Sequence, residues 1–447
     1  MPAPRKRPCV AVIGGATAGA EVAARLADRG SLVAVFEQNP RPFGKIEDGL
    51  PRWHVNLRNK EYATIREKLG RAGIHFVPHT KIGRDIDFRE LVSTWGFSAV
   101  ILANGAWRDR PLPIEGIDRY VDRGLIYQNP FIIAFNHEDE PGYEGRRYEY
   151  PDGALVVGGG LASIDVAKVL MLETTRARLR EREIEASIVD LETKGIPKIL
   201  AGHDLTFEDL GLDGCTIFYR RRVEDMPLSE IPEGATPERA DKVRQGRQRI
   251  LDKAMKKFCF KMEPLCTPDA AIVEDDRLQG LRFRRTRIED GRVVLADETF
   301  ERSGSCIFSS IGSIPEPIAG IDMKGELFDF SDWDIGRIDG YPTVFSVGNV
   351  VTGKGNIVAS RKHATHVSME AIEKFLGLSE GHAGEEELLE TNSEEAARIA
   401  DAVSEGPGLS PDAVEQLLAL VKERQQAVGY KGDFGAWMDE VGPPLQR

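Results

Sequence analysis

Two glycine-rich turns, each between a short apolar segment and a helical pattern, constrain the fold of this chain more than any other feature. The first reads GGATAG at residues 14–19 and follows the apolar segment 9–13. The second reads GGG at residues 158–160 and follows the apolar segment 154–157. A strand, a glycine turn and a helix in this order begin a βαβ unit, whose strands are parallel. The sequence therefore predicts an α/β fold with two such domains.

The first turn has the spacing of a loop that holds phosphates. Gly14 permits the tight turn, Gly19 permits close packing of helix on strand, and the helix amides face the phosphates. The middle position is Ala16, whose methyl group crowds the approach of the phosphates. Glu37 ends the next predicted strand, 18 residues after Gly19, where a carboxylate accepts hydrogen bonds from ribose hydroxyls. The first unit is therefore predicted to be a Rossmann-like dinucleotide-binding domain.

The second turn contains Gly158 and Gly160, with Ser163 in the third position of the pattern. The next apolar segment, 215–219, ends in three arginines, Arg220, Arg221 and Arg222, where an acid would select NAD. Guanidinium groups bind a 2′-phosphate through charge-assisted hydrogen bonds, so the arginines predict NADPH. The alternative is a solvated basic corner. The prediction requires the charged segment 176–194 to be looped out, because the usual spacing is only about 20 residues.

The order of the segments predicts that the second unit is inserted in the first. Proline-rich connectors at 107–116 and 312–317 flank the second unit, and a strand predicted at 343–347 returns the chain to the first. We expect a first domain in two parts, an inserted second domain, and an acidic linker with a helical tail. Their predicted boundaries are 1–108, 109–315, 316–379 and 380–447.

Composition excludes several classes of function. The formal charge is −13 at pH 7, from 59 bases and 72 acids, which argues against broad nucleic-acid binding. No apolar run approaches the roughly 18 residues of a membrane helix, and the apolar segment 9–13 is too short for a signal-peptide core. We expect a cytoplasmic protein. The five cysteines form no C-x-x-C pair, so neither a dithiol relay nor an iron–sulfur cluster is expected, and no metal site is predicted.

The ordered motifs GGATAG, PFGKIEDGLPRWH, VVGGGLASIDVAKVL, YRRR, SSIG and SVGNVVTGKGNIV carry a family resemblance. Over roughly residues 8–375 the chain resembles adrenodoxin-reductase-like ferredoxin–NADP reductases, and YRRRVEDMP is similar to the glutamate synthase small subunit. The resemblance implies FAD in the first domain and NADP in the second. The implied FAD-site residues are Gly14, Gly15, Ala16, Ala18, Gly19, Glu37, Gln38, Gly44, Lys45, Thr80, Asn104, Gly105, Gly348, Asn349, Asn356, Ile357 and Val358. The implied NADP-site residues are Gly158, Gly159, Gly160, Leu161, Arg220, Arg221 and Arg222.

The resemblance also implies polar residues near the reacting rings. Asp165 matches an aspartate facing the nicotinamide end, His54 matches a histidine near the flavin, and either Glu230 or Glu233 matches a glutamate that reaches NADP. Polar packing is the alternative explanation for each. The chain departs from the family at three positions, which are Ala16, Asn349 and Asn356.

The expected function is hydride transfer from NADPH to FAD, followed by release of electrons to an external acceptor. Ferredoxin or a similar iron–sulfur carrier is the leading acceptor. The arginines of LRFRRTR at 281–287 offer basic residues for it, and the solvent face of a strand is the alternative explanation for them. One alternative is an electron-input subunit of a larger oxidoreductase, with the predicted helix 411–427 docking a partner instead of its own domain. Another alternative is an NADPH-binding sensor that has lost FAD.

Overall fold

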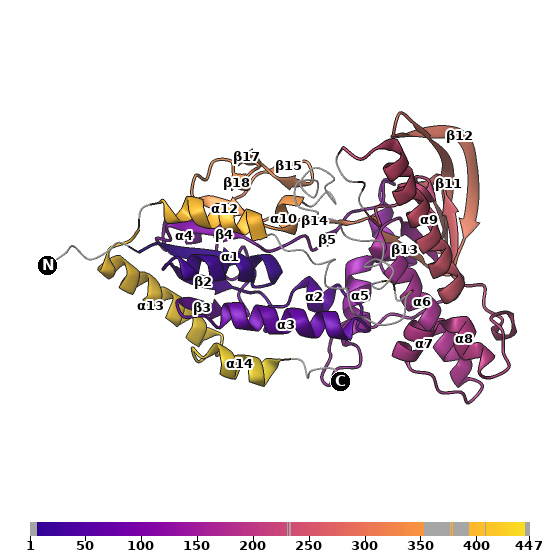
Figure 1. Ribbon diagram of the computed structural model, residues 1–447, viewed down its shortest axis with the longest axis horizontal. Helices are drawn as coiled ribbons and strands as arrows, with labels where there is room; N and C mark the ends of the chain where they lie inside the picture. Colours follow the sequence, from indigo (N-terminus) through magenta and orange to yellow (C-terminus); the bar gives the residue numbers. More distant parts are fainter. Residues whose placement is uncertain are drawn as a thin grey trace.

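The computed structural model describes residues 7–229, 231, 234–352, 376, 378, 393–406 and 408–442. Two α/β lobes lie side by side along the long axis of the molecule (Figure 1). The sheet of the first lobe has five parallel strands in the order β19-β4-β1-β2-β3. These strands are β1 (Cys9–Ile13), β2 (Leu32–Phe36), β3 (Ile74–Val77), β4 (Ala99–Leu102) and β19 (Val344–Ser346).

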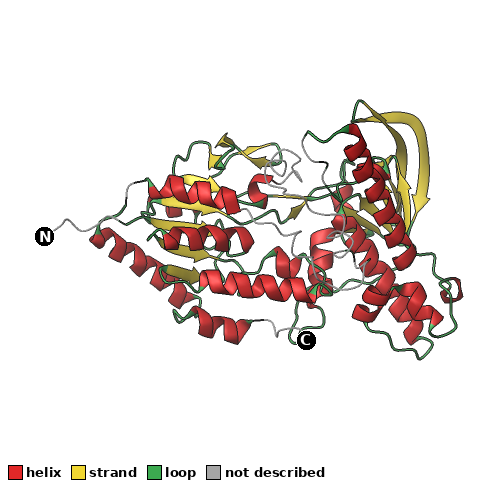
Figure 2. Ribbon diagram, in the orientation of Figure 1, coloured by secondary structure: helices red, strands yellow, loops and turns green. Residues whose placement is uncertain are grey.

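Helices cover both faces of the first sheet, as Figure 2 shows. Alternate residues of β1 enter different cores: Val10 and Val12 pack on one face, Cys9, Ala11 and Ile13 on the other. Burial on both faces explains why β1 is apolar throughout, as expected for a parallel strand. The helices of this lobe are α1 (Thr17–Asp28), α2 (Lys45–Asp48), α3 (Val55–Leu69), α4 (Phe88–Ser93), α10 (Asn349–Thr352), α12 (Ser393–Ser404), α13 (Pro411–Ala427) and α14 (Phe434–Val441).

The second lobe contains another five-stranded parallel sheet, ordered β6-β13-β7-β8-β9. Its strands are β6 (Leu125–Tyr127), β7 (Leu155–Gly158), β8 (Thr216–Tyr219), β9 (Lys261–Pro264) and β13 (Ile307–Ser310). Its helices are α5 (Gln128–His137), α6 (Leu161–Arg180), α7 (Ile188–Lys194), α8 (Ile196–Ala201) and α9 (Pro237–Phe258). Because β7 pairs directly with β8, the charged segment between them is looped out as the sequence required.

A three-stranded antiparallel sheet extends from the second lobe and curves over its outer end (Figure 1). It consists of β10 (Cys266–Glu274), β11 (Arg277–Glu289) and β12 (Arg292–Ser303). Phe283 of β11 stacks on Phe218 of β8 with ring centroids 4.2 Å apart, which joins this sheet to the parallel one. Short ribbons β15 (Met323–Lys324) with β16 (Leu327–Phe328), and β17 (Phe330–Asp332) with β18 (Arg337–Ile338), cover the first lobe.

The two proline-rich connectors lie against each other. β5 (Arg108–Asp109) pairs antiparallel with β14 (Ser313–Ile314), so both chain crossings between the lobes form one small ribbon. The strands of the second sheet all come from residues 125–310, between β4 and β19 of the first sheet.

The helical tail packs on the first lobe. Gln425 of α13 donates to the backbone oxygen of Phe76 on the edge strand β3, and Trp437 of α14 donates to the oxygen of Pro40. Leu417 and Val421 of α13 are buried in the core of this lobe. The apolar face of α13 is thus covered by its own domain, the alternative to partner docking that the sequence left open.

The predicted helices and strands were largely located correctly. The strand expected at the apolar segment 9–13 and the helix predicted at 411–427 have the expected bounds, and the strand before Glu37 spans Leu32–Phe36. The sequence also predicts a helix near 366–376, which lies outside the described residues apart from Leu376. Among the described helices, none combines the length and the apolar character needed to cross a bilayer.

Candidate functional site

The first glycine turn forms a cradle at the amino end of α1. A Cβ atom on Gly19 would lie 1.9 Å from the Gly14 oxygen, and one on Gly14 would lie 2.5 Å from the Ala103 oxygen. Only glycine fits at these two positions, because both obstacles are backbone atoms. Ala16 is the N-cap of α1 and makes no side-chain cap, so the first-turn amides, including that of Ala18, face outward. These amides and the helix dipole suit a pyrophosphate.

The Ala16 methyl group faces the turn that precedes α2. A Cβ on Gly44 would lie 2.8 Å from the Ala16 Cβ, and Gly44 has φ +49°. The glycine at position 44 therefore leaves room for the methyl group that replaces glycine in the phosphate loop. The Ala16 methyl group is therefore compatible with a dinucleotide in the first lobe.

Glu37 is buried where β2 ends and faces the same turn. Its Oε2 accepts from the Gly15 amide at 2.9 Å and its Oε1 accepts from the Asn39 amide at 3.0 Å. Burial raises the pKa of Glu37 to about 7, although these amides oppose the shift. A carboxylate oxygen has two lone-pair sites, so each oxygen can still accept from a ribose hydroxyl.

Gln38 and Thr80 lie next to Glu37. Gln38 is half-buried, and the Thr80 amide donates to the Glu37 backbone oxygen at 2.8 Å. The Thr80 hydroxyl donates to the oxygen of Pro78 and accepts from Arg424 of the tail at 2.9 Å. Thr80 therefore supports the strand end through its backbone, while its hydroxyl anchors the tail.

The strand ends β4 and β19 complete the edge of the first cradle. The Asn104 Oδ1 atom is buried with no hydrogen-bond partner among the described residues, and Gly105 has φ +69°. Asn349 is exposed at the start of α10, and the Gly348 amide donates to Glu395 of α12 at 3.2 Å. Asn356, Ile357 and Val358 lie outside the described residues. The unsatisfied Asn104 oxygen and the glycine cradle fit the edge of a bound FAD.

Lys45 lies at the junction of the lobes. Its Nζ atom donates to Asn129 Oδ1 of α5 and to Ser313 Oγ of β14, both at 3.1 Å. Burial lowers the pKa of Lys45 to about 8, while Asp109 opposes the shift. Lys45 thus connects the start of α2 to the connector ribbon and to the second lobe.

The second glycine turn leaves its phosphate side open. A Cβ on Gly158 would lie 2.4 Å from the Ser310 oxygen, and one on Gly159 would lie 2.0 Å from the Tyr219 ring, but one on Gly160 would meet nothing within 4 Å. Leu161 begins α6, and the Ser163 hydroxyl donates to the Gly160 oxygen at 2.7 Å. Two glycines are required for packing, and the third gives a ligand access to the helix amides.

The three arginines after β8 have different environments. Arg222 pairs with Asp225 and with Glu224, each at 2.9 Å. Arg221 donates to the Gly291 oxygen at 3.2 Å and reaches Asp225 at 4.0 Å. The Arg220 side chain is exposed and forms no ion pair with any residue that the structure describes. Arg220 is therefore the guanidinium most available to a phosphate, and Arg222 the least.

His54 and Asp165 are buried polar residues at the boundary between the lobes. The Trp53 indole donates to His54 Nε2 at 3.1 Å, and because indole only donates, the neutral ring carries its proton on Nδ1. Asp165 is 6% exposed, and its Oδ1 atom lacks a hydrogen-bond partner within the described part of the chain. Burial raises the pKa of Asp165, while Lys168 opposes the shift. Glu230 and Glu233 lie outside the described residues.

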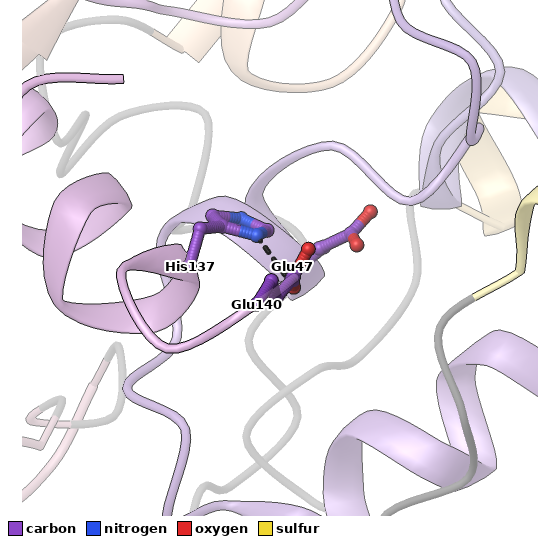
Figure 3. A group of neighbouring side chains, drawn as sticks. All are labelled: Glu47, His137 and Glu140. Carbon is purple, nitrogen blue, oxygen red and sulfur yellow. Dashed lines mark hydrogen bonds and ion pairs between the residues drawn. The ribbon is translucent and has the colours of Figure 1, made fainter. Parts of the chain in front are cut away.

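A further polar group between the lobes carries no signal in the sequence. Figure 3 shows His137 at the end of α5 turned toward Glu140, with Glu47 of α2 beside them. Their possible ligand atoms lie within 4.8 Å of one another, as in a metal site. His137, however, bonds Glu140 through Nδ1 at 2.8 Å and Asp48 through Nε2 at 2.9 Å. A ring that serves two carboxylates has no lone pair left for a metal, so the group is an ion-pair contact between α2 and α5.

The five cysteines are free thiols, and four of them are buried. Burial raises the pKa of Cys9 and Cys259 to about 11 and that of Cys215, Cys266 and Cys306 to about 12. Thiols with such values are poor nucleophiles near neutral pH.

Comparison with known proteins agrees with this geometry, although no protein-family model matches the chain. A probable mitochondrial NADPH:adrenodoxin oxidoreductase of Schizosaccharomyces pombe is 22% identical over 407 residues, which cover 82% of each chain. The resemblance predicted from the sequence is confirmed, because the chain is similar along most of its length to an adrenodoxin reductase. The structure of Mycobacterium tuberculosis FprA in complex with NADPH covers 94% of this chain at 18% identity, with a TM-score of 0.62 and 91% of FprA matched.

A second kind of relative matches only part of this chain. The NADPH-Fe(3+) oxidoreductase subunit beta of Geobacter sulfurreducens is 30% identical over 201 residues, 43% of this chain. The match spans 28% of the length of that subunit. The likeness to FprA shows the two-lobed fold, and the fungal relative extends the sequence similarity across both lobes.

Proposed function

We propose that this chain is an NADPH-dependent flavoprotein oxidoreductase that binds FAD in the first lobe and passes electrons to an external iron–sulfur carrier such as ferredoxin. The observation that carries the proposal is the pairing of two glycine cradles with opposite strand-end chemistry, a buried acid at Glu37 and an exposed cation at Arg220. The first suits ribose hydroxyls, and the second suits a 2′-phosphate.

We further propose an inserted arrangement, in which the FAD domain comprises 1–108 and 316–379, the NADP domain 109–315, and the acidic linker with its helical tail 380–447. The pairing of β5 with β14 supports these boundaries, because both crossings between the sheets occur there. When bound, FAD accepts hydride from the nicotinamide and can release electrons singly.

The residues of the chain supply binding, orientation and charge. The α1 amides and Glu37 hold the dinucleotide of the first lobe, and the Gly160 turn with Arg220 and Arg221 holds NADPH. The buried His54 and Asp165 exclude water at the boundary between the lobes and place an acceptor and a neutral imidazole there. Holding the two reacting rings in contact is the main contribution that the protein makes to such a transfer.

The test is anaerobic reduction of the purified, flavin-loaded protein by NADPH and by NADH. We expect NADPH to bleach the flavin band at a lower concentration than NADH. Replacement of Arg220 by Ala should weaken the binding of NADPH by roughly 10- to 100-fold, because a charged hydrogen bond contributes about 1.5–3 kcal/mol. Arg222→Ala is the matched control, since Arg222 is already paired with acids. Equal use of both nucleotides by the parent, or no flavin uptake, would refute the proposal.

The proposed acceptor is based on the similarity to the fungal relative, which is named as a probable NADPH:adrenodoxin oxidoreductase. The arginines of β11 do not form a free basic patch. Arg282 and Arg284 both pair with Asp269, and Arg285 pairs with Glu263. A ferredoxin surface would therefore have to compete with these acids. Reduction of cytochrome c through added ferredoxin, compared with reduction without it, tests this acceptor.

A second candidate is an electron-input subunit of a larger oxidoreductase. The similarity to a protein named as a subunit favours it, although the match covers 28% of that subunit. Size measurement of the natively purified protein separates the two. A monomer or homodimer with full ferredoxin-linked activity supports the first function, and a stable hetero-oligomer supports the second.

A further inference from the structure

A buried ion pair lies beside Asp165 and joins α6 to α7. Lys168 of α6 is fully buried, and its Nζ atom donates to Glu192 Oε1 of α7 at 2.8 Å. It also donates to the backbone oxygen of Leu376 at 3.2 Å. Glu192 is 2% exposed, although it lies in the charged segment 176–194. Neither residue belongs to the glycine turns or to the arginine corner.

Lys168 and Asp165 share one face of α6. They are three residues apart, a spacing that brings side chains together on a helix. The Lys168 ammonium also lies 4.8 Å from the ring centroid of Trp53, the residue whose indole holds the ring of His54. The Lys168 ammonium therefore lies on the same helix as Asp165 and also contacts the segment that positions His54.

The charged and titratable groups around Asp165 come from several elements. They are His54 before α3, Lys168 on α6 and Glu192 on α7, and Lys257 of α9 acts in turn on Glu192. Burial alone would raise the pKa of Glu192, but its interactions with Lys168 and the other nearby cations together outweigh burial and lower that pKa. Because Lys168 and Glu192 have opposite charge, their effects on Asp165 have opposite sign.

We propose that the Lys168–Glu192 ion pair is a positioning device for the proposed reaction and sets the charge of Asp165 at the boundary between the lobes. Lys168 favours the carboxylate, and Glu192 limits that effect while holding the ammonium in place. A pair kept only for stability has no need to lie one helical turn from a buried acid without a hydrogen-bond partner on Oδ1 in the described chain. The proposal rests on the proposed function, but the titration of Asp165 that tests it does not require that function.

The experiment measures the protonation of Asp165 by infrared pH-difference spectroscopy on the full-length, flavin-loaded protein. The carboxyl band is assigned by its loss in Asp165→Asn. We expect Lys168→Met to shift the titration to higher pH and Glu192→Gln to shift it to lower pH, each by about one unit. The double variant Lys168→Met/Glu192→Gln should titrate within a few tenths of a unit of the parent. Lys194→Met is the control, because the Lys194–Asp190 pair lies on the same α7 but is half-exposed.

The sign of the shifts decides the outcome. Destabilisation by lost packing would move both single variants in the same direction, and a remote pair would move neither, so either result overturns the proposal. If one single variant does not fold, the remaining single variant must still differ from the double variant with the predicted sign. The pH profile of flavin reduction by NADPH should move with the infrared titration. A protein that takes up no flavin refutes the proposed function, while the titration of Asp165 still tests the ion pair.

Discussion

The contact between α2 and α5 predicts a specific dependence of stability on pH. Burial alone would lower the pKa of His137, but hydrogen bonds with Asp48 and Glu140 outweigh it and raise the pKa to about 9. A raised folded-state pKa stabilises the fold fully below the unfolded value of about 6.5 and loses that stabilisation as the pH rises through 9. The contribution of His137 to the free energy of unfolding is therefore lost between pH 6.5 and 9.

The size of this contribution follows from the shift. A change from 6.5 to about 9 corresponds to at most about 3 kcal/mol. The Glu140 side chain is 41% exposed, which screens its half of the interaction, so we expect about 2 kcal/mol. The Asp48 bond is retained at nearly full strength, since that side chain is 17% exposed.

Urea denaturation at pH 6 and at pH 9 measures the effect. The parent should lose about 2 kcal/mol more than His137→Phe over this interval. Subtracting the variant removes the titration of other buried groups, such as Lys45. His203→Gln serves as the control, because His203 is exposed. If the parent and His137→Phe lose the same free energy, His137 is not the protonated link that its two hydrogen bonds indicate.

Three further predictions concern the cradle, the tail and the thiols. Gly19→Ala should abolish flavin binding, measured by visible absorbance, because the new Cβ would lie 1.9 Å from a backbone oxygen; Gly202→Ala, with 3.3 Å to its nearest neighbour, should bind normally. Trp437→Ala should lower the unfolding free energy by about 2 kcal/mol, half the cost of a fully buried aromatic. If the tail packs elsewhere, calorimetry would instead show an unchanged melting temperature. Native protein should react slowly with a disulfide reagent at pH 8, with Cys259 the fastest of the five thiols; rapid loss of NADPH-driven flavin reduction on thiol blocking would contradict the absence of a dithiol relay.

The sequence was sufficient for features that depend on local rules. The segments around Gly14 and Gly158 were placed as strands and turns because a glycine turn after an apolar run has few other conformations. The looped-out segment before β8 was also inferred, since the arginines could reach a nucleotide only if β8 paired with β7. Such constraints connect residues near one another along a single βαβ unit.

Contacts between distant segments were not predictable in the same way. Lys168 looks like one of many charged residues in a helix, and Glu192 lies in a stretch of alternating charge, so nothing in either segment indicates their burial. The Arg282–Asp269 and Arg284–Asp269 pairs arise from the register of β10 on β11, which sequence spacing does not fix. For this reason the sequence does not reveal that these arginines of LRFRRTR are already paired with acids.

The interaction network at the junction ties the reaction geometry to the stability of the two-lobed fold. Lys45 bonds across it to Asn129 and Ser313, and His137 bonds across it to Asp48. Directional hydrogen bonds fix the relative orientation of two bodies, whereas apolar contacts between them tolerate sliding. A hydride donor and acceptor need that orientation. Each glycine cradle lies wholly within one lobe. A variant that breaks one of these bonds should therefore reduce the rate of flavin reduction at saturating NADPH more than it weakens the binding of either nucleotide.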